Sequence, residues 1–194
     1  MKNVIITLFS LCVMGLSTSM AFAEESSEFA RNGFYIGAGG IYAIENFSRT
    51  GALSFDDSLG FNLRVGYRLH PHIAIEAEGE RTMGFDAKQF KGDVETWTAT
   101  LNSKFFALTG RIQPYGLLGV GAMNATTDGF LVFVNSNGST SRNETDVAFR
   151  YGGGVDFYLT KNWVIDIEGA YVDPRGDINS INYISVGGGL QYRF

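Results

Sequence analysis

The sequence has almost no cysteine and few prolines, and each shortage excludes a class of structure. Its single cysteine is Cys12, and Leu11 stands where a lipoprotein signal needs a small residue. The chain after residue 23 therefore has no disulfide and no thiolate chemistry. Pro71, Pro114 and Pro174 fall in an expected turn, at a strand start and in a loop, so none interrupts the hydrogen-bond ladder of a strand.

Long apolar runs and an excess of basic residues are also missing. After residue 23 the longest nearly apolar stretch is 115–123, which is too short for a spanning helix of about 20 residues. The net charge of −5 argues against a nucleic-acid partner. The sequence is rich in glycine, with 25 residues, and in aromatic residues, at 14%. This composition suits a membrane barrel whose lipid-facing and inward faces differ.

The first 23 residues have the organisation of a secretory signal peptide. Lys2 supplies the positive charge, residues 4–16 form an apolar run, and Ala21-Phe22-Ala23 fits the small-x-small cleavage pattern. The apolar run is short for an uncleaved membrane anchor. We therefore expect a signal peptide at 1–23, cleavage after Ala23, and one domain at 24–194.

From Gly33 onward the hydrophobicity alternates with a period of two, which is typical of β-strands. Each alternating run is long enough to cross a bilayer as a tilted strand of about 9–11 residues. Short turns alternate with long polar stretches at 44–58, 83–94, 124–145 and 173–180, as in outer-membrane barrels. The eight expected strands are 33–43, 59–69, 73–82, 95–106, 113–123, 146–159, 163–172 and 181–194.

One parity of these strands is apolar and places its aromatic residues near the strand ends. If this face contacts lipid, the aromatic residues form two belts at the membrane interfaces. In a soluble β-sandwich the same face would be the core, and a core has no reason to place its aromatic residues in two belts. The expected belt on the periplasmic side is Phe34, Tyr67, Phe105, Phe157, Trp163 and Tyr192, and the outer belt is Tyr42, Phe61, Trp97, Phe149 and Tyr171.

The other parity carries charge into an interior that has room for side chains only. Buried charges must pair, so the near balance of signs predicts a plug of ion pairs. If the turn places Leu159 opposite Trp163, then Asp156 faces Asp166. If Leu69 lies opposite Ile73 in the first hairpin, then Arg64 faces Glu78, and these two opposite charges can pair with each other. The two aspartates repel each other, so we expect Lys104 or Arg64 to contact Asp156 or Asp166. The candidate plug residues are Arg64, Glu76, Glu78, Lys104, Arg150, Asp156, Asp166 and Glu168.

Several segments resemble the OmpA-like family of small outer-membrane barrels, and together they cover essentially all of 33–194. They read LGFNLRVGYRLHPHIAIEAEGE at 59–80, GGGVDFYLTKNWVIDIEGAYV at 152–172, GFYIGAGGIY at 33–42 and PYGLLGVG at 114–121. The resemblance implies an all-β, eight-stranded, antiparallel up-and-down transmembrane barrel in the bacterial outer membrane. It does not extend to the family's peptidoglycan-binding domain.

The end of the chain resembles the terminal signal of outer-membrane barrels. Gly189, Tyr192 and Phe194 match its glycine, aromatic and final phenylalanine, although Gly187 replaces the usual polar residue two positions earlier. The resemblance implies that the barrel assembly machinery recognises this strand.

Candidate catalytic and metal-binding residues are scarce. A barrel hydrolase needs Ser, His and a carboxylate together, and the only histidines, His70 and His72, flank Pro71 in a turn. The three glycines at 152–154 are not a phosphate-binding loop, because no lysine followed by Ser or Thr comes after them. The acidic pair Asp56-Asp57 could contact a cation, but it suits a solvated turn better. We expect no enzyme activity, no cofactor and no metal.

The third long loop contains an apolar run at 130–134, followed by the hairpin signal Asn137-Gly138. Either the flanking strands extend above the membrane as a ribbon, or the run is a patch for a surface partner. We expect a structural or surface-interaction protein, with outer-membrane lipid around the barrel and a host or envelope partner on the long loops. The alternative function is a narrow gated porin-like channel for ions or small solutes.

Overall fold

The strands form one antiparallel sheet that closes on itself. The computed structural model describes residues 28–45, 58–83, 85–86, 93–128, 142–176 and 182–194. The strands in this part are β1 (Gly33–Glu45), β2 (Ser58–His70), β3 (Ile73–Thr82), β4 (Phe85–Asp86), β5 (Asp93–Phe106), β6 (Ile112–Asp128), β7 (Arg142–Tyr158), β8 (Trp163–Arg175) and β9 (Tyr183–Arg193).

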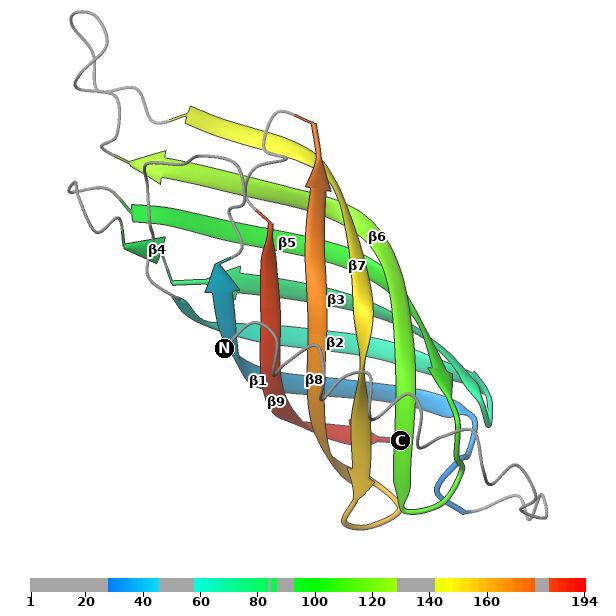
Figure 1. Ribbon diagram of the computed structural model, residues 1–194. Helices are drawn as coiled ribbons and strands as arrows, with labels where there is room; N and C mark the ends of the chain where they lie inside the picture. Colours follow the sequence, from blue (N-terminus) through cyan, green and yellow to red (C-terminus); the bar gives the residue numbers. More distant parts are fainter. Residues whose placement is uncertain (1–27, 46–57, 84, 87–92, 129–141, 177–181) are drawn as a thin grey trace, which may run out of the picture.

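Closure comes from two pairings between strands that are not consecutive along the chain. β1 pairs with β9, and β3 pairs with β5, so that eight long strands form a complete ring (Figure 1). The two-residue strand β4 lies outside this ring and pairs only with the start of β5. The expected all-antiparallel, eight-stranded barrel is therefore confirmed. Among the described residues, no helix has the length and apolar character to cross a membrane.

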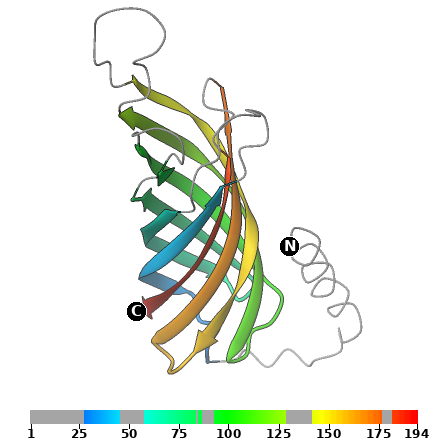
Figure 2. The ribbon, with the colours of Figure 1, turned by 60° about the vertical axis from the view of Figure 1, so that its left-hand side comes forward.

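The short turns and the end of the chain lie at one end of the barrel. The turns are 71–72, 107–111 and 159–162, and the turn after β7 is closed by the Leu159 amide, which donates to the Trp163 carbonyl at 2.9 Å. The Phe194 amide donates to the Phe34 carbonyl at 3.0 Å, so the last residue lies beside the start of β1. Figure 2 shows the barrel from a second side, with the turn between β7 and β8 at its lower end.

The two faces of the wall are distributed as the alternation predicts. Large apolar side chains point outward; Leu63, for example, is 59% exposed. The neighbours Asn62 and Arg64 point inward and are buried. A wall that is apolar outside and charged inside suits a lipid environment.

Aromatic side chains cluster at the two rims of the outer surface. At the turn end, the ring centroids of Phe34 and Tyr67 are 4.7 Å apart, and those of Trp163 and Tyr192 are 5.0 Å apart. At the other rim, Phe61 and Trp97 both face Arg81 in the strand register. These positions agree with the two predicted belts.

Three details differ from the sequence prediction. β6 runs to Asp128 and β7 starts at Arg142, so part of the expected loop 124–145 is a paired ribbon. Pro174 lies inside β8 rather than in a loop. It faces Ala148 of β7, and because the β9 pairing stops at Val172, the missing N–H of Pro174 breaks no ladder on that side.

The third difference is a register shift in the first hairpin. Ile73 pairs with His70 instead of the expected Leu69, because the register shifts between Arg68 and His70 and leaves Leu69 as an extra residue. The shift ends there, and Arg64 still faces Glu78. The cleavage residues Ala21 and Ala23, the pair Asp56-Asp57 and the run at 130–134 lie outside the described residues.

The outward parity yields a test of the membrane position. Val65 lies outward in the middle of β2, whereas Leu69 lies outward on the same strand next to the turn. A lysine costs about 2–4 kcal/mol at the bilayer midplane and about 0–1 kcal/mol near the interface. We expect Val65→Lys to lower the amount of folded, heat-modifiable protein in membrane fractions, and Leu69→Lys to leave it nearly unchanged. Normal folding of Val65→Lys would contradict this position.

Candidate functional site

The interior of the barrel is the candidate site, because the alternation directs eleven charged side chains into it. Each is at most 5% exposed. The basic residues are Arg64, Arg68, Lys104, Arg150 and Arg193, and the acidic residues are Glu76, Glu78, Glu80, Asp156, Asp166 and Glu168.

Glycines make room for the largest inward side chains. Tyr35 faces Gly66 on the neighbouring strand, and a Cβ at Gly66 would overlap its ring. Tyr115 faces Gly154, where a Cβ would come within 2.6 Å of the phenol oxygen. Each aromatic ring therefore folds over a glycine on the next strand and reaches the centre of the barrel.

Glu168 on β8 is the centre of the charge network. Its Oε1 lies 2.9 Å from the Arg150 guanidinium, and its Oε2 lies 3.2 Å from the Lys104 ammonium. The Tyr115 hydroxyl donates to the same Oε2 at 2.7 Å, and Arg64 approaches it at 3.9 Å. One carboxylate thereby joins cations from β2, β5 and β7.

Arg150 connects this centre to the acidic row on β3. Its guanidinium lies 2.8 Å from Glu80 and 3.2 Å from Glu78. Glu80 also accepts a hydrogen bond from the Tyr183 hydroxyl at 2.7 Å, and Asn62 donates to Glu78 at 2.8 Å. Because several donors share each carboxylate, the row of glutamates is buried without isolated charges.

The paired aspartates are arranged as the register predicts. Asp156 faces Asp166, and the Arg64 guanidinium binds Asp166 through two contacts of 2.7 and 2.9 Å. The Gln191 amide donates to Asp156 at 3.4 Å. The expected contact between Arg64 and an aspartate is therefore present. Lys104 binds no aspartate within the described residues and pairs with Glu76 at 3.0 Å.

The expectation that Arg64 and Glu78 satisfy each other is wrong. Arg64 and Glu78 face each other on the adjacent strands β2 and β3. Arg64 nevertheless binds Asp166 on β8, and Glu78 binds Arg150 and the Asn62 side-chain amide. Long side chains on neighbouring strands project together into the lumen. The charged end of Arg64 meets Asp166 on β8, and Glu78 meets Arg150 on β7, so both side chains find their partners across the barrel.

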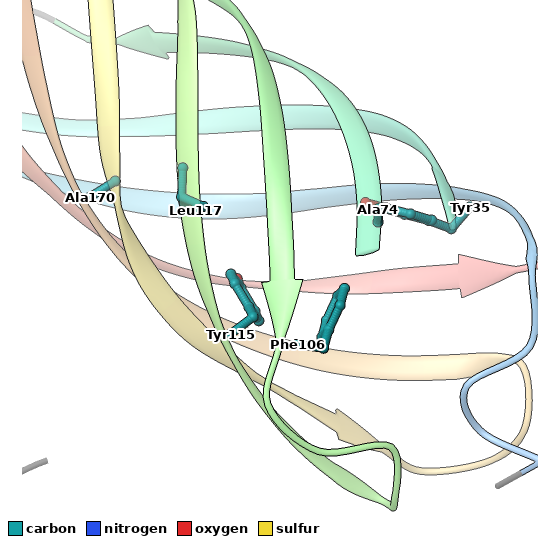
Figure 3. Packing of buried hydrophobic residues seen from close by; sticks show 6 residues of the cluster. All are labelled: Tyr35, Ala74, Phe106, Tyr115, Leu117 and Ala170. Atoms are coloured by element: carbon teal, nitrogen blue, oxygen red, sulfur yellow. The ribbon is translucent and has the colours of Figure 1, made fainter. Parts of the chain in front are cut away.

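A layer of arginine and aromatic rings closes the turn end. Arg68 donates to Gln113 at 2.7 Å and to the Tyr158 hydroxyl at 3.2 Å, and it lies 4.0 Å from the centroid of Phe106. The Phe29 ring packs against Tyr158 with centroids 5.5 Å apart. Figure 3 shows the neighbouring side chains of this layer, which include Phe106 and Tyr115, inside the wall.

An apolar cluster occupies the other end of the lumen. The side chains of Ala43, Met123, Ala148, Val172 and Tyr183 are each 0% exposed and pack together. The Tyr183 hydroxyl reaches down to Glu80, so this cluster rests directly on the charge network. The interior thus consists of three filled layers: arginine with aromatics, ion pairs, and apolar side chains.

Sequence reasoning missed several of the residues that complete these layers. Tyr115 and Met123 lie on β6, where Leu117 points inward and Leu118 outward, so the run is apolar on both faces. Alternation cannot assign the faces of such a run. The glycines opposite Tyr35 and Tyr115 were a usable signal, but only once the strand register is known.

The histidines lie away from this interior. The His70 and His72 rings are 5.9 Å apart in the first turn, and His72 Nδ1 contacts the Phe106 carbonyl at 2.8 Å. Within the described residues, no group of three or more His, Cys, Asp or Glu side chains is placed to hold a metal ion.

Comparison with known proteins supports the architecture. The outer membrane protein beta-barrel domain family matches residues 9–194. No curated protein matches the chain. Among solved structures, Ail of Yersinia pestis is 22% identical, with a TM-score of 0.58, covering 84% of this chain and all of Ail.

Two further barrels share the fold at lower identity. Neisserial surface protein A is 16% identical with a TM-score of 0.61, covering 83% of this chain and 97% of its own. The N-terminal barrel of Pseudomonas aeruginosa OprF is 14% identical with a TM-score of 0.54, covering 84% of this chain and all of that domain. The family match spans nearly the whole chain, so this is a bacterial outer-membrane protein that belongs to the outer membrane protein beta-barrel domain family.

Proposed function

We propose that the protein is a non-enzymatic component of the outer membrane that acts through its outer loops on a host surface or another envelope component. The observation that carries this proposal is the filled interior. Ion pairs join Arg64, Lys104 and Arg150 to carboxylates on strands that are not their neighbours, and packed layers cover the network at both ends. A barrel of this kind is a scaffold that presents its outer end.

The longest strands support a surface role. β6 and β7 have 17 residues each, whereas about 9–11 are enough to cross the bilayer. The surplus of about six residues is roughly 20 Å long, measured along the strand at about 3.3 Å per residue. Figure 1 shows this ribbon extending past the other strands. It carries the connection at residues 129–141 at its tip.

The similar structures favour the same interpretation. Ail is named an attachment invasion locus protein, and one of its structures contains the heparin analogue sucrose octasulfate. NspA is named a surface protein. By analogy we place a partner on the outer loops of this chain. Because its net charge is −5, we expect that partner to be something other than a polyanion.

The proposal includes no catalytic centre and no cofactor. A Ser-His-carboxylate hydrolase requires a histidine beside the nucleophile, and both histidines lie in the first turn, away from the outer end of the barrel. The alternative is a narrow gated channel, which would open if the interior pairs rearranged. Arg150 alone contacts Glu78, Glu80 and Glu168, so opening a path would break several contacts together.

The ion-pair network should dominate stability. Lys104→Ala removes the cation between Glu76 and Glu168 and leaves both carboxylates buried. Breaking a buried pair costs about 3–5 kcal/mol. We expect a lower midpoint of urea unfolding in lipid vesicles. Lys161→Ala is the control, because its pair with Glu28 is exposed and worth about 0–1 kcal/mol. Equal midpoints for the two variants would rule out a stabilising network.

The loops should carry the partner contacts. We expect replacement of residues 129–141 by a Gly-Ser segment of equal length to abolish adhesion of expressing cells to host cells, or their survival in serum, while the barrel still assembles. Replacement of residues 87–92 is the control for general surface disturbance. If both variants and the parent behave alike in both assays, the loop at the ribbon tip has no such role.

We further propose that Gly189, Tyr192 and Phe194 direct assembly through the barrel assembly machinery. Deletion of Phe194 should lower the amount of folded protein in outer-membrane fractions, yet leave refolding of the purified protein intact. Phe34→Ala, which removes an exposed aromatic at the same rim, is the matched control. Unchanged membrane levels without Phe194 would refute the signal.

A further inference from the structure

Two arginines at the turn end of the lumen are buried without an acidic partner. Arg68 on β2 is 0% exposed and Arg193 on β9 is 5% exposed. Within the described residues neither forms an ion pair with a carboxylate, and the hydrogen bonds of Arg68 go to neutral acceptors. The inward carboxylate at this level is Asp156, which faces Gln113 and accepts a hydrogen bond from Gln191. Two cations and one carboxylate leave one positive charge in a buried layer, where a charge is costly without a counter-charge.

The hydroxyl of Tyr158 is the point where the two guanidiniums meet. Arg68 donates to it at 3.2 Å, and Arg193 donates to the same oxygen. This hydroxyl still has its own proton to donate, and no described residue accepts it. The Nη2 atom of Arg193 is also buried, and it has no acceptor among the described residues. A water molecule that accepted these bonds would leave the charge unbalanced, so the donors and the charge together favour an anion.

The segment before β1 covers this layer. The Phe29 ring packs against the Tyr158 ring with centroids 5.5 Å apart, and the Arg111 guanidinium lies 5.3 Å from the Phe29 centroid. Arg111 directly precedes β6, and β6 stands opposite β1 in the closed ring. Residues 28–32, which we call the strap, therefore cross the mouth of the barrel from the start of β1.

The remaining attachments of the strap are exposed. The Glu28 carboxylate lies 2.5 Å from the Lys161 ammonium, and both side chains are more than half exposed. The Arg31 guanidinium donates to the Lys161 carbonyl at 3.4 Å. Exposed pairs of this kind contribute little to stability. The strap can therefore detach while the strands of the wall stay paired.

We propose that Arg68, Arg193 and Tyr158 bind one phosphate-sized oxyanion that enters from the turn end, and that the strap covers it. Guanidinium groups match the oxygens of phosphate and carboxylate through charge-assisted hydrogen bonds, and the Tyr158 hydroxyl adds a further donor. The site lies at the end opposite the β6–β7 ribbon, so it is independent of any partner of the outer loops.

The test of the site is isothermal titration calorimetry of the refolded full-length protein in detergent. The probe is inorganic phosphate, and sodium chloride keeps the ionic strength constant. We expect the parent to bind one phosphate per chain, and Arg193→Gln to bind it roughly tenfold more weakly, as the loss of a charge-assisted hydrogen bond implies. Arg193→Lys keeps the charge without the planar fork and should have intermediate affinity.

A second variant keeps the test decisive if Arg193→Gln does not refold, which heat-modifiable migration reveals. Tyr158→Phe removes one hydroxyl and should also weaken phosphate binding. The control is Arg175→Gln, which removes an exposed cation that pairs with Asp173, and it should bind phosphate as the parent does.

The strap is tested by the rate at which bound phosphate exchanges with free phosphate, measured by phosphorus NMR. We expect Phe29→Ala to speed this exchange, because the ring that covers Tyr158 is removed. Phe34→Ala is the matched control, since this exposed aromatic lies at the same end and points outward.

Three results would overturn the site. The first is the absence of phosphate binding by the parent. The second is parental affinity in both Arg193→Gln and Tyr158→Phe. The third is an equal loss of affinity in Arg175→Gln, which would show a general effect of charge. Equal exchange rates in Phe29→Ala and Phe34→Ala would overturn the covering role of the strap.

Discussion

Every charge that the strand alternation turns inward must find an opposite charge or a set of hydrogen-bonding groups, because an eight-stranded barrel has room inside for side chains only. Glu168 satisfies this requirement for three cations from different strands, and Arg150 satisfies it for three carboxylates. The contacts of Lys104 with Glu168 and of Arg150 with Glu78 and Glu80 join strands that are not neighbours, so the network crosses the lumen. The same contacts that make burial tolerable therefore also fill the barrel.

The other features of the wall follow from this crowding. Glycines such as Gly66 and Gly154 face inward where a tyrosine ring from the next strand needs their space. A larger residue at either position would collide with a phenol ring, so these glycines follow from the inward tyrosines.

The sequence was sufficient to predict the strands, the two faces and the facing pair Asp156 and Asp166, because a period of two and tight turns determine all three. It predicted a contact of Lys104 or Arg64 with one of these aspartates, and the structure shows which cation makes it. It was insufficient where the answer depends on side-chain reach or on closure. Alternation cannot show that Arg64 pairs with Asp166 rather than with Glu78, which it faces. It also cannot show which of Leu117 and Leu118 points inward.

Conductance across a planar lipid bilayer tests most directly whether this interior is closed. The refolded protein would be inserted in neutral salt, and current would be recorded at constant voltage. A barrel filled by ion pairs between an arginine-aromatic layer and an apolar cluster predicts no steady current above that of the bare bilayer. Long-lived current steps from the unmodified protein would contradict a closed interior and favour a channel.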